Sequence, residues 1–146
     1  MADPTRFMER FFKTLEGGRL DQIISLAAPD IVYVDMSDPR PVTGRAAYRE
    51  VLAGIFAGLP DFKAHKWTLV VQGDRVAAEL ELGGTHLGPF LGYPATGAEI
   101  RWPASSFYTL NHGRDQIVRE VWYHDMGALN RQLAAQSPLI QPVRSK

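Results

Sequence analysis

The sequence predicts an α+β fold in which three N-terminal helices are wrapped by a curved, mainly antiparallel sheet, with another helix at the C-terminal end. Two observations carry this prediction. Apolar residues recur at helical spacing in three segments before Pro60, and from Phe62 onward they alternate in the period of a strand. Helices followed by a run of antiparallel strands are typical of the α+β class. A curved sheet around such helices leaves a cone-shaped hollow, a shape that favours ligand pockets.

The first helix begins at residues 3–4, where an aspartate N-cap is followed by proline at the first helical position. Its apolar stripe repeats every fourth residue and consists of Phe7, Phe11 and Leu15. The second helix is expected at about residues 20–27. A turn at residues 36–44 then leads to the third helix, whose apolar face is formed by Tyr48, Leu52, Ile55 and Leu59.

Five strands are predicted, at about residues 31–35, 62–71, 76–82, 98–110 and 116–125. Gly73 and Asp74 make a hairpin turn between the second and third of them. Pro103 lies inside the fourth strand and has no N–H to donate, so we expect a bulge or an edge there. A last helix is predicted at residues 126–135.

The chain of 146 residues fits one domain, placed at residues 1–136, followed by a tail at 137–146. The formal charge of zero and the pI near 6.9 offer no basis for binding nucleic acid or an anionic membrane. The sequence has no cysteine, which excludes disulfides and thiolate chemistry. It shows neither a signal-peptide pattern nor a membrane-spanning segment, so we expect a cytoplasmic protein.

Two stretches resemble the SnoaL-like polyketide cyclases, in the superfamily named after nuclear transport factor 2. They are "GTHLGPFLGYPATG" (residues 84–97) and "HGRDQIVREVWYHDMGALNRQL" (residues 112–133). The segment "LEGGRLDQIISLAAPDIVYVDMSDPRPVTG" (residues 15–44) also resembles the N-terminal half of ketosteroid isomerases. These resemblances imply a cone-shaped barrel around a small-molecule pocket, and a homodimer formed through the convex face of the sheet.

The resemblance also implies which strand face looks into the cone, and counting in steps of two then selects the inward residues. Asp35 matches the general base of ketosteroid isomerases, and a carboxylate on an apolar wall has a raised pKa suited to proton transfer. The structural alternative is that Asp35 accepts hydrogen bonds in a turn with Ser37. His86 and His124 are the candidate acid partners, because an imidazole exchanges protons near neutral pH. For His86, the alternative is a structural histidine that pins the loop.

The remaining candidate pocket residues are expected to bind the substrate. Aromatic rings offer flat walls for a cyclic ligand, although core packing would explain each ring equally well. The predicted substrate-binding set is Tyr33, Trp102, Ser106, Tyr108, Trp122 and Phe11. Asp35, His86 and His124 could in principle hold a divalent ion, but their spacing matches no short ligand motif. We therefore expect no metal and no cofactor.

This chain departs from both families at the residues that carry their chemistry. The isomerase tyrosine falls on Phe11, and no acid stands near Ser106. The cyclase histidine and aspartate fall on Ser106 and Trp122. The resemblance then implies an enzyme that performs cofactor-independent acid–base chemistry, an isomerisation, cyclisation or related carbon-acid reaction, on an apolar cyclic or polyketide-like substrate. Three alternatives remain: a non-catalytic small-molecule-binding protein, a protein–protein adaptor, and a limonene-type epoxide hydrolase, whose Asp–Arg–Asp set is not evident because Arg101 and Arg119 have outward parity.

Overall fold

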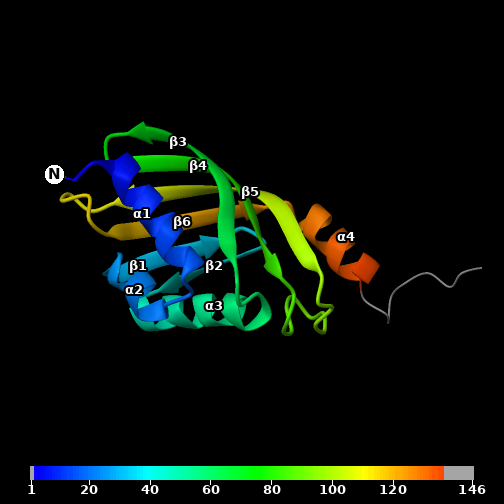
Figure 1. The fold of residues 1–146 in the computed structure, drawn as a ribbon. Coiled ribbons are helices and arrows are strands. Elements are labelled where there is room, and N and C mark those ends of the chain that lie inside the picture. Colours follow the sequence, from blue (N-terminus) through cyan, green and yellow to red (C-terminus); the bar gives the residue numbers. More distant parts are fainter. Residues whose placement is uncertain (1, 137–146) are drawn as a thin grey trace, which may run out of the picture.

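The computed structural model describes residues 2–136, where four helices and a six-stranded sheet form the α+β fold predicted from the sequence (Figure 1). The predicted tail at 137–146 lies outside the described residues. The helices are α1 (Pro4–Glu16), α2 (Leu20–Ser25), α3 (Arg45–Gly58) and α4 (Met126–Gln136). The strands are β1 (Ala27–Asp35), β2 (Asp38–Thr43), β3 (Lys63–Gln72), β4 (Arg75–Thr85), β5 (Glu99–Leu110) and β6 (Ile117–His124).

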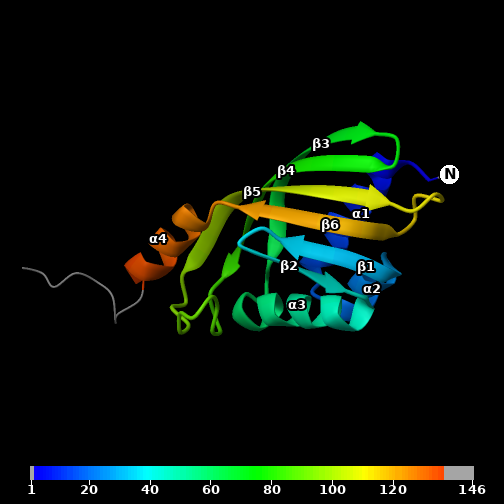
Figure 2. The same ribbon diagram turned by 180° about the vertical axis from the view of Figure 1, so that it is seen from behind.

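The strands lie in the order β2-β1-β6-β5-β4-β3. All neighbouring pairs among them are antiparallel except β1 and β6, which run parallel. The sheet is curved but open, and Figures 1 and 2 show that α1, α2 and α3 lie on one face of it, whereas α4 continues beyond the end of β6. The mainly antiparallel, cone-like architecture is thereby confirmed.

Helix α1 packs its apolar stripe against the inner face of the sheet, where it contacts β3. The Asp3 side chain caps the helix by accepting a hydrogen bond from the Thr5 N–H at 3.0 Å. Gly18 adopts a φ of 63° just after the helix, a conformation that glycine reaches without strain. The buried residues of α1 are Pro4, Phe7, Met8, Phe11, Phe12 and Leu15. The predicted helix and its core face are therefore confirmed.

Two boundaries near β1 differ from the prediction. Helix α2 ends at Ser25, because the backbone from Ala27 onward already belongs to β1, where Ala27 pairs with Ile117 of β6. The predicted turn at residues 36–44 contains a sixth strand, β2, which pairs with β1 only. Its two prolines suggested a turn, but an edge strand tolerates proline because one of its sides needs no hydrogen-bond donors.

A bulge or an edge was predicted at Pro103, and the pairing of β5 with β4 shows no bulge there. The register from Arg75↔Thr109 to Thr85↔Glu99 is continuous through Pro103. The pairing with β6 begins only at Ala104, and the Pro103 carbonyl accepts a hydrogen bond from the backbone N–H of Asp125, beyond the end of β6. In a strand the nitrogen and the carbonyl of one residue face the same side. The missing N–H therefore points past the last residue of β6 and costs no ladder bond.

No helix in the described part of the chain is long and apolar enough to cross a membrane.

Candidate functional site

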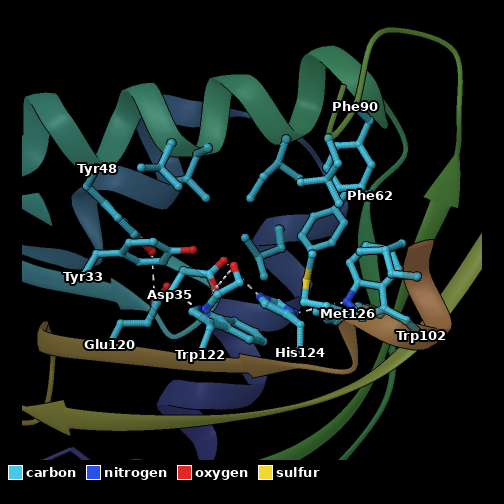
Figure 3. A pocket seen from close by; sticks show the side chains of 18 of the residues that line it. Tyr33, Asp35, Tyr48, Phe62, Phe90, Trp102, Glu120, Trp122, His124 and Met126 are labelled. Carbon is cyan, nitrogen blue, oxygen red and sulfur yellow. Dashed lines mark hydrogen bonds and ion pairs between the residues drawn. The ribbon is translucent and has the colours of Figure 1, made fainter. Parts of the chain in front are cut away.

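A cavity of about 140 Å³ lies between the inner face of the sheet and helices α1, α3 and α4 (Figure 3). Most of its wall is apolar, and seven aromatic residues contribute to it: Phe11, Tyr33, Tyr48, Phe62, Phe90, Trp102 and Trp122. The polar residues in the wall are Asp35, Ser37, Glu120 and His124. Polar groups in an apolar hollow are strongly directional, since little water competes with them.

Asp35 and His124 face each other in this cavity. Strands β1 and β6 are parallel, with Asp35 beside Trp122, so His124 is the next inward residue of β6. The Asp35 Oδ2 atom lies 3.5 Å from Nε2 of His124. The other oxygen, Oδ1, accepts hydrogen bonds from the backbone N–H of Ser37 at 2.9 Å and from its hydroxyl at 2.7 Å. Asp35 thus makes the turn contact of the structural alternative with one oxygen and presents the other to the cavity.

A hydrogen bond from Trp102 sets the tautomer of His124. The indole Nε1–H of Trp102 donates to Nδ1 of His124 at 3.1 Å, and an indole can only donate. The neutral imidazole must then carry its hydrogen on Nε2, the nitrogen that faces Asp35. Burial lowers the pKa of His124 below its usual value, and the Asp35 carboxylate opposes this effect. His124 is therefore held as a neutral ring that presents an N–H donor beside Asp35.

Glu120 is a second carboxyl in the cavity, and the sequence did not single it out as a site residue. Its exposed fraction is 2 %, compared with 30 % for the Asp35 side chain, so it lies at the closed end of the cavity and Asp35 lies at the mouth. The Tyr48 hydroxyl donates to Oε1 at 3.0 Å, and the Trp122 indole donates to Oε2 at 2.8 Å. Burial raises the pKa of Glu120 to about 7, against the lowering effect of these two hydrogen bonds.

Tyr33 joins this polar end of the cavity. It pairs with Glu120 across β1 and β6, and its ring lies 5.7 Å from that of Tyr48. Figure 3 shows its phenol beside Tyr48, above Glu120 and Asp35 in this view. Burial raises the pKa of Tyr33, and the charges of Glu120 and Asp35 raise it further. Its hydroxyl therefore stays protonated and can act as a hydrogen-bond donor.

His86 lies outside the cavity wall, in the loop that covers one end of the cavity. We name this segment, residues 86–98, the cover loop. His86 is fully buried, and its Nδ1 lies 3.0 Å from the hydroxyl of Thr96, while its backbone N–H donates to Ala98. Phe90, whose ring centroid is 6.4 Å from that of His86, lines the cavity instead. These contacts match the structural alternative, in which the histidine pins the loop.

The predicted substrate-binding residues separate into two groups. Phe11, Tyr33, Trp102 and Trp122 line the cavity. Ser106 and Tyr108 have the predicted inward parity but lie in the core behind the wall, where the Ser106 hydroxyl donates to Tyr108 at 2.9 Å. The ring of Tyr108 packs edge-on against Phe11 and Trp122, which separate it from the hollow. Parity fixes the face of a strand but not the depth of a side chain behind its neighbours.

Neither a cationic side chain nor a metal-ligand group is built into the described part of this site. The lining of the cavity includes no lysine or arginine. Arg101 is exposed and pairs with Glu81 and Glu99, and Arg119 is exposed as well, as their parity predicted. Within residues 2–136, no group of three or more histidine, aspartate or glutamate residues is arranged to hold a metal ion. The cavity therefore lacks the arginine that an Asp–Arg–Asp epoxide hydrolase set needs.

Comparison with known proteins places the cavity in a family context. The sequence profile of the SnoaL-like polyketide cyclase family matches residues 3–133. No curated protein matches the chain. Solved structures with the same fold include a proposed SnoaL-like polyketide cyclase from Jannaschia sp. CCS1, with 24% identity over 90% of this chain and 92% of that one and a TM-score of 0.80.

Two further structures extend the comparison. AclR from Streptomyces galilaeus, a proposed hydroxylase, is 22% identical over 91% of this chain and 96% of its own, with a TM-score of 0.78. A proposed SnoaL-like polyketide cyclase from Shewanella putrefaciens CN-32 is 18% identical over 93% of this chain and 88% of its own, with a TM-score of 0.82. At these identities the likeness establishes a shared fold.

Proposed function

Because the chain belongs to the SnoaL-like polyketide cyclase family, we propose that it is an enzyme that catalyses acid–base chemistry on an apolar cyclic substrate without a cofactor. The observation that carries the proposal is the pair of Asp35 and His124 at the mouth of an aromatic-walled cavity. A separation of 3.5 Å is too long for a strong hydrogen bond, so neither group is committed to the other. A substrate in the cavity can therefore contact both groups.

In this proposal Asp35 is the base and His124 the acid partner. Oδ2 of Asp35 takes a proton from a carbon next to a carbonyl. The electron pair of the broken C–H bond forms a carbon–carbon double bond, and the π pair of the carbonyl moves to its oxygen. The Nε2–H of His124, with the Tyr33 hydroxyl, donates to that oxygen as its charge develops; one such donor is worth about 3 kcal/mol. Return of the proton to a different carbon completes an isomerisation. Alternatively, the carbanion attacks a second carbonyl of the substrate and forms the ring, and the oxygen of that carbonyl takes the proton from Asp35, which completes a cyclisation.

The test uses cyclohexanone as a probe, because proton removal can be detected without knowledge of the natural substrate. We expect the protein in deuterated water to accelerate the exchange of the hydrogens next to the carbonyl, measured by proton NMR. Asp35→Asn should reduce this acceleration by at least about a hundredfold, the usual contribution of a positioned general base. Asp30→Asn is the matched control, since Asp30 is an exposed aspartate on the same strand. Unchanged exchange in Asp35→Asn would reject the role of this residue as the base.

Binding without reaction is the outcome that would favour the non-catalytic alternative. In that case cyclohexanone would shift the indole N–H signals of the cavity tryptophans in an NMR titration, but no exchange would accompany it. Asp35→Asn would then leave the binding unchanged. Exchange that depends on Asp35 excludes this alternative.

We further propose that the protein forms a homodimer through the outer face of its sheet. Phe107 of β5 and Tyr123 of β6 are 42 % and 45 % exposed, and their rings lie 5.9 Å apart on that face. An exposed aromatic pair on a sheet face that none of the described helices covers suits an interface (Figure 2). Analytical ultracentrifugation should give the mass of a dimer for the wild-type chain and of a monomer for Phe107→Glu. A monomeric wild-type protein would exclude the interface.

A further inference from the structure

The closed end of the cavity holds a carboxyl that forms no ion pair with any lysine or arginine in the described part of the chain. Glu120 is in contact with Tyr48 of α3 and with Trp122 of its own strand, and Tyr33 of β1 and Tyr108 of β5 also face it. All of these partners are uncharged. A buried carboxylate is usually paired with a positive charge, and removal from water without such a partner disfavours ionisation. The arrangement suits a glutamate that exchanges its proton easily.

The position of that proton follows from the two hydrogen bonds. Trp122 can only donate, so Oε2 of Glu120 remains an acceptor and the carboxylic hydrogen must sit on Oε1. Oε1 then donates to the hydroxyl oxygen of Tyr48, reversing the bond that the carboxylate receives. This reversal frees the hydrogen of the Tyr48 hydroxyl, and Tyr48 lines the cavity. The protonated state therefore presents a donor to a ligand, and the ionised state withdraws it.

The size of the cavity limits the ligand that can reach this donor. An apolar cavity of about 150 Å³ holds one benzene-sized molecule, and the volume here is about 140 Å³. Asp35 stands beside Trp122 in the sheet, so it is two residues further along than Glu120. From strand geometry the Cα atoms of the two acids are about 8 Å apart. One six-membered ring can thus lie between the mouth and the closed end.

We propose that Glu120 and Tyr48 form a polar subsite that holds an uncharged oxygen atom of a single-ring ligand at the closed end of the cavity. The inference rests on the proposed function in that this ligand is taken to be the substrate of Asp35. The subsite selects for a ring that carries a carbonyl, ether or hydroxyl oxygen. It disfavours a carboxylate, because no positive charge is present among the described lining residues to receive one.

Binding to this subsite depends on pH in a defined direction. An ionised Glu120 holds the Tyr48 hydrogen and repels the lone pairs of a ligand oxygen. Asp35 and His124 are further ionisable groups in the same cavity, so the effect of Glu120 must be isolated by substitution. Glu120→Gln cannot ionise, and its amide can donate to Tyr48 as the protonated acid does. Tyr48→Phe removes the donor at every pH.

The experiment is an NMR titration of the full chain with cyclohexanone at about pH 5 and about pH 9. These values lie on either side of the pKa of Glu120, which burial raises to about 7. We expect the wild-type protein to bind about tenfold more weakly at the higher pH, the value of one hydrogen bond. Glu120→Gln should bind equally at both, and Tyr48→Phe should bind weakly at both. Cyclohexene, which lacks the oxygen, is the ligand control and should show no such dependence. Glu79→Gln, an exposed glutamate on β4, is the protein control and should behave as wild type.

The outcomes separate the subsite from the reaction. A Glu120→Gln protein that keeps the wild-type pH dependence would overturn the subsite, and so would tighter binding of cyclohexylamine than of cyclohexanone at the higher pH. A different result would be that deuterium exchange requires Asp35, whereas Tyr48→Phe binds cyclohexanone and catalyses the exchange as well as the wild type. That result would support the proposed reaction and overturn the subsite. Binding that depends on the oxygen atom of the ligand, without any deuterium exchange, would support the subsite and reject the reaction.

Discussion

The wild-type protein should lose stability as the pH rises from acidic to neutral, and replacing Glu120 by glutamine should abolish most of this loss. In the folded chain, burial raises the pKa of Glu120 from the ordinary 4.5 to about 7. The folded state therefore holds this proton over a pH range in which the unfolded chain has already released it. Stability then falls as pH rises through that range, because the unfolded state binds fewer protons. The contribution is complete below about pH 4.5 and is lost above about pH 7.

The magnitude follows from the same shift. Each pKa unit corresponds to about 1.36 kcal/mol, so the full loss is about 3 kcal/mol. About 2.5 kcal/mol of it falls between about pH 5 and about pH 8, because the unfolded glutamate is already mostly ionised at the lower value. A domain of this kind has a total stability of about 5–15 kcal/mol, so the loss is easily measured.

The assay is urea unfolding followed by tryptophan fluorescence at these two pH values. The quantity compared is the change in unfolding free energy with pH, because glutamine alters the hydrogen bonds to Tyr48 and Trp122 at every pH. His124 contributes with the opposite sign: its lowered pKa costs stability as pH falls, and both proteins retain it. Glu79→Gln should follow the wild type. If Glu120→Gln loses as much stability toward high pH as the wild type, the raised pKa of Glu120 is refuted.

Two further predictions concern the hydrogen bond to His124 and the contact between α3 and the cover loop. Trp102→Phe removes the donor to Nδ1 of His124, so the pKa of that imidazole should rise, measured by NMR titration of its ring protons; an unchanged pKa would show that the indole does not fix the tautomer. Gly58→Ala should destabilise the chain by about 1–3 kcal/mol, because the new Cβ would lie 2.8 Å from atoms of the cover loop. Gly54→Ala, in the same helix with nothing within 4 Å, should instead stabilise it by up to about 1 kcal/mol in urea unfolding. Equal effects of the two alanines would contradict the close contact.

Residues that follow a strict period could be placed from the sequence. Tyr33 and Asp35 on β1, and Trp122 and His124 on β6, were predicted to face inward, and all four line the cavity. The prediction works because successive side chains of a strand point to opposite faces. It also works because the pairing of β1 with β6 is continuous from Tyr33 to Asp35, although the pairing of β1 with β2 shifts register there.

The closeness of Asp35 and His124 could not be predicted in the same way. It depends on β1 lying beside β6 in parallel, with Asp35 level with Trp122. These strands are far apart in the sequence, and strand order is a property of the whole sheet. Strand β2 was not predicted for a related reason. Its prolines suggest a turn unless the strand is known to lie at an edge of the sheet.

The sequence around Glu120 carries a sign of its burial. A glutamate that shares inward parity with Val118 and Trp122 is unusual, because charged residues are rarely fully buried. What the sequence could not supply is its environment. The donor from Tyr48 comes from a helix that packs across the cavity, and Tyr48 otherwise fits the apolar face of that helix.

Strand β6 joins the two polar ends of the cavity through a single ring. The Trp122 indole donates to Glu120 on one side, and its ring is stacked on His124 on the other, at 5.3 Å and 1°. By resemblance, this position carries the catalytic aspartate in the cyclases. A rigid indole at that place moves the ionisable groups to the inward positions before and after it, about 7 Å away along the strand. A ligand that reaches both ends must therefore match a fixed spacing. In the proposed reaction the base is Asp35 of the neighbouring strand, which lies level with the indole.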